Sequence, residues 1–554
     1  MTNKSTEDIF VLAEEESKKY IEAILKSSSR RKIVVAGPGT GKTYLFKKIL
    51  EGKKNCLTLT FVNSLVEDLS LELYGLSEVK TLHGFARGIL RSVNKNVKVY
   101  PKLSEVIRED ARIILKKDID FDNIFHNVKN EEEHIEFYKK RKKFYDGHYG
   151  YSDIIYGAVK LLEVKKELIP SYEQVLVDEF QDFNQLEILL IDLLAEKSPI
   201  LVVGDDDQAL YDDLKSASVE HIRKRYDKNN GSYETFTLPH CRRCTRVIVE
   251  AANDILKTAV KSGLLKERIF KRYDYFEHKD KNVESDSNPK IIYSQQFVKK
   301  IPWFIEQQLG KIAEEVKGKF SVLIISPTNL HLNLIVASLR DKGFENIASV
   351  EKREANQTTL LDGLVILLED VRSNLGWRII SKFILNDNEF EKLLIDASED
   401  NAKNIYEMIG KDHKKKINKI LKHLRAIKGK REIKEEDLYD CLKYLGINPF
   451  KLAKETLLKN IAFYKAMDPA LRKIYLRATT VQSSKGLSAD YVFITNFDDR
   501  FFIKNKDKAE ITDKDIRNFL VALTRAKKRV YLVSSEKKFP IFLKWIEKNR
   551  AEII

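Results

Sequence analysis

The sequence predicts an α/β protein built on two parallel-sheet domains. An apolar run at 33–35 leads into a glycine-rich segment at 36–43, which a helix-compatible segment at 44–50 follows. Helical patterns separate this run from later ones, and strands that alternate with helices form parallel βαβ units. The later apolar runs, each bordered by polar residues, lie at 174–177, 200–203, 320–326, 491–494 and 529–533.

The glycine-rich segment after the first apolar run has the composition of a phosphate-binding loop. Glycines let backbone N–H groups close on phosphate oxygens, and the N-terminus of the following helix adds positive potential. A lysine at the end of such a loop reaches the β- and γ-phosphates, and the next hydroxyl can ligate Mg²⁺. The segment predicts a nucleoside triphosphate site made by Ala36, Gly37, Pro38, Gly39, Thr40, Gly41, Lys42 and Thr43.

Composition restricts the class of protein further. The chain has 554 residues, enough for three or four folding units, and a formal net charge of +15, which suits a polyanionic partner. Four cysteines do not suggest a disulfide framework and fit a reducing cytosol. No apolar run reaches the roughly 20 residues of a membrane span, and no secretory signal opens the sequence. We therefore expect a cytoplasmic protein without a membrane partner.

Carboxylates follow two of the expected strands. Asp178 and Glu179 come directly after the run at 174–177, and an acidic segment at 205–207 follows the run at 200–203. Ligands of α/β sheets sit at the carboxyl ends of the strands. One carboxylate there can hold Mg²⁺ while its neighbour polarises an attacking water. For Asp178 and Glu179, this pattern favours a catalytic role over a solvated acidic loop.

A second α/β unit near the end of the chain contributes an arginine. Arg525 lies among small and apolar residues before the apolar run at 529–533. An isolated arginine is normally a surface residue. Its place in a second α/β unit favours the alternative, an arginine finger that reaches a nucleotide on the first unit.

Taken together, these segments resemble the motifs of superfamily 1 helicases of the UvrD/Rep/PcrA type. The likeness runs nearly end to end, and the motifs occur in the order that is typical of that family. The matching segments are 36–43 (motif I), 60–63 (motif Ia), 81–85 (the Thr-x-His-Gly element), 178–182 (motif II), 204–211 (motif III), 238–243 with 251–253 (motif IV), 480–487 (motif V) and 521–526 (motif VI).

The resemblance implies a fold, an activity and its partners. The fold is α/β, with two RecA-like parallel-sheet P-loop domains and mainly helical accessory insertions. The activity is that of an ATP-dependent DNA helicase or translocase that uses ATP and Mg²⁺ and moves 3′ to 5′ on single-stranded or tailed DNA. The implied parts are a first RecA-like domain at 1–85 and 173–285, an insertion at 86–172, a second RecA-like domain at 286–350 and 470–554, and a reduced insertion at 351–469.

The resemblance also assigns roles to residues. Thr43 and Asp178 hold Mg²⁺, and Glu179 orients or deprotonates the attacking water. Gln208, Arg242 and Arg525 sense the γ-phosphate from both sides of a cleft between the domains, with Arg243 as the alternative to Arg242. Gly486 joins the nucleotide site, and the nucleic-acid contacts fall on Phe61, Asn63, His83, Tyr211 and Lys485.

Several positions depart from the pattern of the family. No glutamine precedes Gln174, so the residue that reads adenine is missing and the choice between ATP and GTP stays open. The segment at 212–215 lacks the aromatic residue that stacks a DNA base in the family, and Gln482 and Ser488 replace the usual His and Glu of motif V. We expect weak unwinding of long duplexes by the isolated chain.

Two basic runs and a cysteine pair allow alternative interpretations. Lysines between 414 and 425 surround an apolar stripe and face either phosphate or water. Cys241 and Cys244 form a single CxxC pair, for which we prefer buried side chains to a zinc site because no second pair accompanies it. A basic run flanked by aromatic residues indicates either a single-strand surface or a solvated helix face, and consists of Lys139, Lys140, Arg141, Lys142 and Lys143.

The sequence is consistent with three alternative functions. The first is a nucleic-acid-stimulated ATPase that acts as a 3′-to-5′ DNA translocase or helicase. The second is the ATPase subunit of an antiphage defence complex that works with a separately encoded nuclease, because a compact chain of this type resembles the helicase-like subunit of the Gabija system. The third is a nucleotide-gated scaffold that binds nucleic acid with little unwinding.

Overall fold

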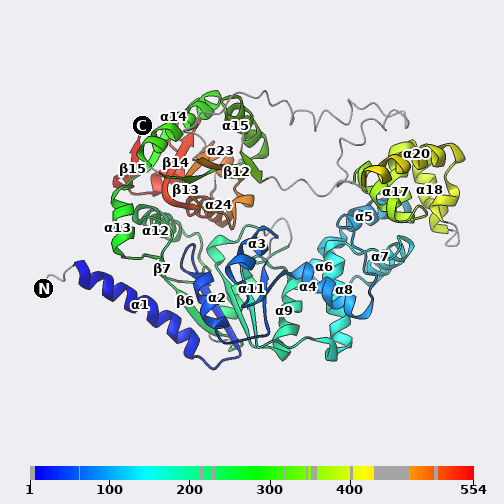
Figure 1. Cartoon of the computed structure of the whole chain (residues 1–554), viewed down its shortest axis with the longest axis horizontal. Coiled ribbons are helices and arrows are strands. Elements are labelled where there is room, and N and C mark those ends of the chain that lie inside the picture. The colour runs from blue at the N-terminus through cyan, green and yellow to red at the C-terminus, as the bar shows by residue number, and fades with distance from the viewer. Residues whose placement is uncertain are drawn as a thin grey trace. The chain divides into compact units, whose positions relative to one another are not determined.

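Two parallel β-sheets and a separate group of helices make up the chain in this computed structural model (Figure 1). One compact unit comprises the described residues within Met1–Leu82, Lys166–Lys352 and Phe463–Ile554, and a second comprises those within His83–Lys165 and Arg353–Ala462. The structure describes residues 6–60, 63–211, 216–227, 229, 231–316, 318–344, 347–350, 358–399, 404–428, 474–503 and 510–554.

Six parallel strands form the first sheet, in the order β3-β2-β4-β5-β1-β6. The central strands are buried along their whole length, as continuous apolar runs predict for a parallel sheet that is covered on both faces. The strands are β1 (Arg31–Ala36), β2 (Cys56–Thr60), β3 (Glu78–Thr81), β4 (Gln174–Val177), β5 (Ile200–Gly204) and β6 (Glu234–Leu238).

Helices cover this sheet and complete what we call the first lobe. Phe46 and Ile49 of one helix pack with Val34 and Leu201 of the sheet in a shared apolar core. Another helix begins with a capping box, in which Asn184 caps the backbone of the first turn. The helices are α1 (Thr6–Lys26), α2 (Lys42–Leu50), α3 (Asn63–Glu72), α9 (Gln185–Lys197) and α11 (Glu220–Tyr226).

Seven parallel strands form the second sheet, in the order β11-β12-β10-β13-β14-β9-β15. Both faces carry apolar cores, so helices lie on each side (Figure 1). The strands are β9 (Ile291–Gln295), β10 (Phe320–Ser326), β11 (Ala348–Val350), β12 (Ile474–Thr480), β13 (Ala489–Thr495), β14 (Ala526–Ser534) and β15 (Ala551–Ile553). The helices of this second lobe are α12 (Arg246–Lys261), α13 (Lys279–Asp286), α14 (Ile301–Glu315), α15 (Asn329–Asp341), α23 (Asp499–Phe502), α24 (Asp513–Leu523) and α25 (Ile541–Trp545).

The boundary between the lobes differs from the prediction. We expected the first domain to continue to residue 285, but Ile248 and Ile255 of α12 lie in the apolar core of the second sheet, together with Phe519 of α24. The order of the motifs does not show on which sheet a helix packs, so the sequence placed α12 one domain too early. The small parallel pair β7 (His240–Cys241) and β8 (Asp274–Tyr275) flanks this helix in sequence.

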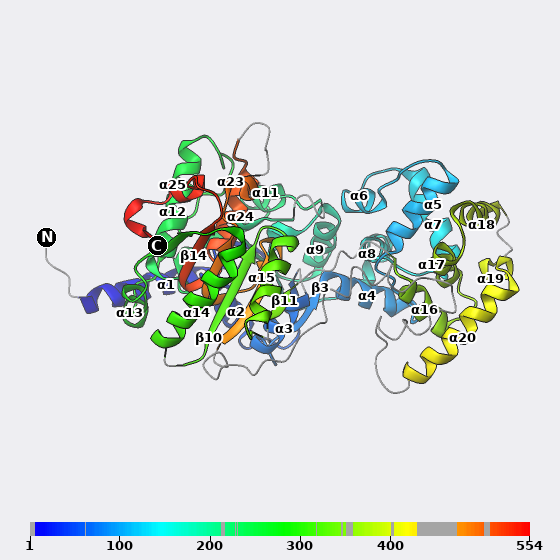
Figure 2. The same cartoon turned by 90° about the horizontal axis from the view of Figure 1, so that it is seen from above.

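The second unit consists of helices, as we expected for the insertions (Figure 2). In α20 the predicted apolar stripe is buried, and Ile417 and Leu424 are fully covered. None of the helices that the structure describes is long and apolar enough to cross a membrane. The helices are α4 (Leu82–Val93), α5 (Leu103–Ile114), α6 (Phe121–His126), α7 (Glu132–Phe144), α8 (Tyr151–Val164), α16 (Leu360–Glu369), α17 (Asn374–Ile384), α18 (Asp387–Glu399), α19 (Ile405–Met408) and α20 (Lys411–Lys428).

A buried ion-pair network joins the two insertions, which the sequence treated as separate parts. Asp110 of α5 is fully buried and accepts from Arg141 of α7 over 2.9 Å and from Arg378 of α17 over 3.0 Å. Burial acts to raise the pKa of Asp110, but the two arginines hold it below its usual value. The described residues of both insertions therefore form one unit. The α/β class, with two parallel sheets and helical insertions, is confirmed.

Candidate functional site

The segment between β1 and α2 folds into a loop that can hold phosphate. Helix α2 begins at Lys42, with Gly41 as its N-cap at φ +92°. Gly39 also has a positive φ of +72°, a conformation that a residue with a side chain adopts only under strain. The Thr40 hydroxyl donates to the Gly37 carbonyl over 2.9 Å and closes the loop. Backbone N–H groups of such a loop at a helix N-terminus form an anion site.

Side chains from a later part of the chain pack against this loop. A Cβ atom on Gly37 would lie 2.8 Å from the ring of Tyr273, and one on Gly39 would collide with Arg243. The Tyr273 hydroxyl donates to the Pro38 carbonyl over 3.0 Å. Close neighbours therefore require glycine at positions 37 and 39, and at Gly39 the positive φ requires it as well.

Lys42, Asp178 and Glu179 lie together at the carboxyl end of the first sheet. Lys42 Nζ is 3.3 Å from Glu179 Oε1, and the Glu179 N–H donates to Asp178 Oδ1 over 3.0 Å. Burial and the charge of Glu179 raise the pKa of Asp178 to about 6. Burial also acts to raise the pKa of Glu179, but Lys42 and Lys485 outweigh it and lower that pKa. Neighbouring carboxyls with pKa values pushed apart suit different roles.

Gln208 and Arg525 meet, although they belong to different lobes. Arg525 Nη2 donates to Gln208 Oε1 over 3.0 Å, and Arg525 Nε donates to the Val521 carbonyl over 2.9 Å. Burial and the neighbouring Arg243 lower the pKa of Arg525 to about 10, so the guanidinium stays charged at neutral pH. The structure brings together two residues that the sequence separates by more than 300 positions.

Lys485 and Tyr211 require a correction. We expected both to contact nucleic acid, but Lys485 is 5% exposed and Tyr211 is 3% exposed. Lys485 Nζ pairs with Asp182 and donates to the Gln208 carbonyl over 2.7 Å. The Tyr211 hydroxyl donates to the Gln482 carbonyl over 3.1 Å. Both side chains therefore make contacts between the lobes, and the Lys485 ammonium neutralises the charge of the buried Asp182 carboxylate.

The structure also corrects the choice of Arg242 as a γ-phosphate sensor. Arg242 Nη2 donates to Glu14 of α1 over 3.1 Å, and its guanidinium lies 3.7 Å from the centre of the Phe276 ring. Arg243 instead packs on the phosphate-binding loop, and its charge contributes to the lowered pKa of Arg525. Of the two alternatives, Arg243 is the one beside the candidate site.

The remaining predicted residues are Gly486, His83, Phe61 and Asn63. Gly486 has φ +82° and follows Lys485 directly. His83 at the start of α4 makes an edge contact with the Tyr151 ring, with 5.1 Å between the centroids. Phe61 and the side chain of Asn63 fall outside the described residues. The roles of these residues stay predictions.

The basic run of α7 is only partly available to a partner. Arg141 is 5% exposed and bound to Asp110, and Lys142 pairs with Asp153 over 2.7 Å. The prediction that Arg141 and Lys142 bind nucleic acid is therefore corrected, because both side chains form ion pairs with buried carboxylates. Lysines of the same run that are exposed are Lys139, Lys140 and Lys143.

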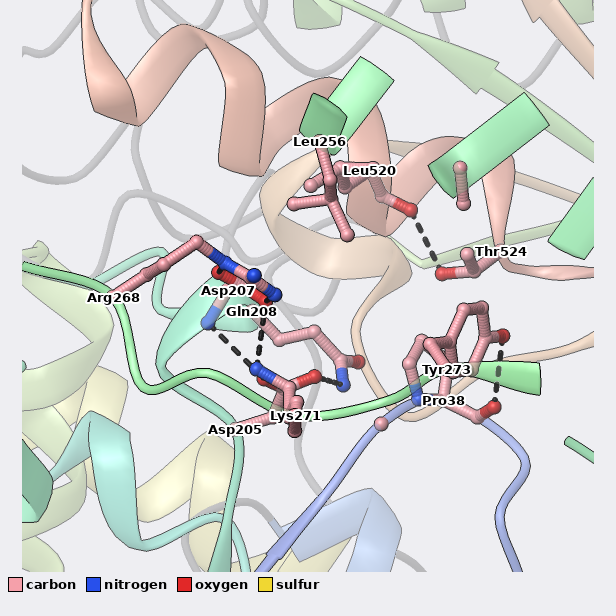
Figure 3. A pocket seen from close by; sticks show the side chains of 12 residues that line it. Pro38, Asp205, Asp207, Gln208, Leu256, Arg268, Lys271, Tyr273, Leu520 and Thr524 are labelled. Carbon is pink, nitrogen blue, oxygen red and sulfur yellow. Dashed lines mark hydrogen bonds and ion pairs between the residues drawn. The ribbon is translucent and has the colours of Figure 1, made fainter. Parts of the chain in front are cut away.

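Sequence reasoning missed Tyr273 and Lys271, which lie outside every motif. Tyr273 holds the phosphate-binding loop, and Lys271 is buried among the carboxylates that follow β5 (Figure 3). Glycine at position 37 indicates that another group packs closely against the loop there. The sequence does not show that this group is the Tyr273 ring.

Oxygen donors suited to Mg²⁺ are present at the candidate site. Thr43, the second residue of α2, offers a hydroxyl, and the buried Asp178 offers a carboxylate, both ligand types that Mg²⁺ prefers. A second acidic group consists of Asp205, Asp206 and Asp207. Lys271 Nζ pairs with all three of its carboxylates, so an ammonium already supplies the positive charge there.

Comparisons with known proteins agree with this geometry. A family model described as an AAA domain matches residues 21–213, and one described as a UvrD-like helicase C-terminal domain matches residues 237–537. The chain is 21% identical to a probable DNA helicase II homolog of Mycoplasma capricolum over 90% of this chain and 81% of that protein. It is 22% identical to the ATP-dependent DNA helicase PcrA of Staphylococcus aureus over 92% of this chain and 82% of that protein. The match to DNA helicase II of Escherichia coli is 27% identical and covers 45% of this chain and 41% of that protein.

Proposed function

Because the chain belongs to the UvrD-like helicase family, we propose that it is an ATP-dependent DNA translocase that moves 3′ to 5′ and is stimulated by single-stranded DNA. The observation that carries the proposal is the contact of Arg525 with Gln208 over 3.0 Å. It connects the lobes close to the phosphate-binding loop, where a residue from the second lobe could respond to a nucleotide on the first.

The residues of the first lobe would bind and activate the substrate. Lys42 and the loop N–H groups bind the β- and γ-phosphates of ATP. Thr43 and Asp178 would hold Mg²⁺, which neutralises charge on the phosphate oxygens when bound. Glu179 is ionised because Lys42 and Lys485 lower its pKa, so its carboxylate can accept a hydrogen bond or a proton from the attacking water.

The second lobe would complete the site only when the cleft is closed. Arg525 and Arg243 bring positive charge to the phosphates, where negative charge develops during transfer. A DNA strand bound across both lobes would favour the closed arrangement, and hydrolysis would release it. This coupling turns ATP hydrolysis into movement along the strand.

ATP turnover with and without single-stranded DNA tests the proposal. We expect turnover to rise with DNA, Lys42→Ala to abolish it, and Glu179→Gln to reduce kcat by about 10²-fold or more while ATP still binds. Lys47→Ala in the same helix is the control, because Lys47 pairs only with the exposed Glu72 among the described residues. Equal turnover with and without DNA, or a fully active Glu179→Gln, would contradict the proposal.

The direction of movement needs its own assay. A translocase that moves 3′ to 5′ displaces streptavidin from a biotin at the 5′ end of a single strand much faster than from one at the 3′ end. The opposite preference would show that the polarity is wrong and would leave the ATPase proposal intact.

A second candidate is the ATPase subunit of a defence complex with a separately encoded nuclease. The sequence at 212–215 favours it, because the base-stacking aromatic residue of the family is absent and stacking is worth about 1–3 kcal/mol per base. We expect the isolated chain to displace the strand of a long 3′-tailed duplex weakly and to co-purify with its partner from the native host. Efficient unwinding of several hundred base pairs by the chain alone would exclude a partner-dependent helicase.

A further inference from the structure

One segment of the second lobe contacts both the phosphate-binding loop and the carboxylates that follow β5. Residues 268–273 follow α12, and Tyr273 at their end contacts the phosphate-binding loop. Lys271 of the same segment lies in a pocket beside Gln208 and Tyr273, into which its side chain points (Figure 3). Its side chain is 4% exposed, so the ammonium is almost completely removed from solvent.

The three carboxylates around Lys271 differ in whether a second cation pairs with them. Asp206 also pairs with Arg223 over 3.2 Å, and Asp207 also pairs with Arg268. Among the residues that the structure describes, Lys271 is the one cation within ion-pair distance of Asp205, with 2.7 Å between Nζ and Oδ1. Loss of the Lys271 charge would therefore affect Asp205 more than its two neighbours.

Asp205 in turn fixes the amide of Gln208. Gln208 Nε2 donates to Asp205 Oδ2 over 2.6 Å, and Gln208 Oε1 accepts from Arg525 over 3.0 Å. A carboxylate only accepts and a guanidinium only donates, so these partners allow one orientation of the amide. An amide nitrogen carries two hydrogens, and Asp205 takes one, which leaves the other able to donate to a phosphate oxygen.

We propose that Lys271 is a positioning residue for ATP hydrolysis, which acts by holding Asp205 as the acceptor that orients the Gln208 amide (Figure 3). The inference rests on the proposed function, in which Gln208 faces the γ-phosphate. Without the ammonium, the Asp205 carboxylate is left buried beside two others and either takes up a proton or turns away. In both cases the Gln208 amide loses the partner that aims its N–H group.

Steady-state kinetics of Lys271→Met with saturating single-stranded DNA test this role. We expect kcat to fall about 10²-fold and the KM for ATP to change less than threefold, because the phosphate-binding loop and Lys42 are intact. Lys271→Arg restores a cation and should recover kcat to within about fivefold of the wild type. A stability defect alone would lower the active fraction of Lys271→Met, so active-site titration with a tight nucleotide analogue normalises kcat.

Asp205→Ala and Asp206→Ala form a matched pair. Both remove a carboxylate from the same cluster, but only Asp205 touches Gln208. Asp205→Ala should repeat the loss of kcat, whereas Asp206→Ala should stay within threefold of the wild type. Equal losses in both variants, or a normal kcat in Lys271→Met, would overturn the inference while the activity of the wild type keeps the proposed function. A wild type without turnover would overturn both.

Discussion

Arg525 of the second lobe donates to the side-chain amide of Gln208 in the first lobe over 3.0 Å, and both side chains are buried. This hydrogen bond joins the lobes together with the contacts that Lys485 and Tyr211 make across them. The Arg525 guanidinium keeps its charge at neutral pH, because its pKa is lowered only to about 10. A charged donor at this place makes the contact sensitive to any new negative charge in the cleft.

Replacement of Arg525 by alanine should therefore affect the reaction more than binding. We expect kcat to fall roughly 10³-fold, the scale of an arginine finger, and the affinity for ATP to change little. Single-turnover hydrolysis and equilibrium nucleotide binding separate the two effects. A collapse of affinity with a normal rate at saturation would instead assign Arg525 to ground-state binding.

The neighbouring arginines 242 and 243 should behave differently from each other. Arg243→Ala removes positive charge beside the phosphate-binding loop and should lower kcat about 10²-fold or more. Arg242→Ala removes a contact to Glu14 and the Phe276 ring and should leave kcat within threefold. Turnover of the two variants at saturating ATP decides between them. The reverse ranking would mean that the exposed arginine turns into the site when nucleotide binds.

Much of this site could be predicted from sequence, because its chemistry is local. The phosphate-binding loop, Asp178 and Glu179 each follow a buried strand directly, and a strand end fixes where such residues lie. Arg525 also stood out among small and apolar neighbours, but its hydrogen bond to Gln208 was not predicted. Tyr273 and Lys271 could not be found in this way, because their role depends on how a loop without regular structure crosses the first lobe.

The basic run of α7 shows a signal that was present but not used. Tyr138, Arg141 and Tyr145 are spaced by three and four residues, which places them on one face of a helix. Two buried aromatic residues on that face indicate that the arginine between them is also buried. The partner that takes its charge, Asp110, lies on another helix, and sequence periodicity does not reveal such pairings.

The exposed and buried members of this run predict a difference in salt dependence. Neutralising Lys139, Lys140 and Lys143 should lower the log–log salt slope of single-strand binding by about 0.7 for each true phosphate contact. Arg141→Met should leave the slope unchanged and destabilise the second unit by about 3 kcal/mol, because it leaves Asp110 short of one partner. Fluorescence anisotropy across a salt series and thermal unfolding measure the two effects. An unchanged slope in the lysine variant would mean that the three lysines face only water.

Asp153 predicts a pH dependence of local stability in the same unit. It is 3% exposed and pairs with Lys142 over 2.7 Å, and burial raises its pKa to about 6 in spite of this lysine. An unfolded aspartate has a pKa of about 3.9. Between these values the folded state holds a proton that the unfolded state has lost, so stability falls as the pH rises through about 6.

Comparison with Asp153→Asn isolates this effect, because an amide does not titrate. Relative to the variant, the protection of the α8 amides in the wild type should fall as the pH rises from about 4 to about 6 and should change little above pH 7. Hydrogen exchange of both proteins at the same pH removes the intrinsic pH dependence of exchange. Burial lowers the pKa of Lys142, and the charge of Asp153 opposes this lowering. A difference between the two proteins that is constant from pH 5 to pH 7 would show that Asp153 is already ionised at pH 5 and that Lys142 compensates fully for its burial.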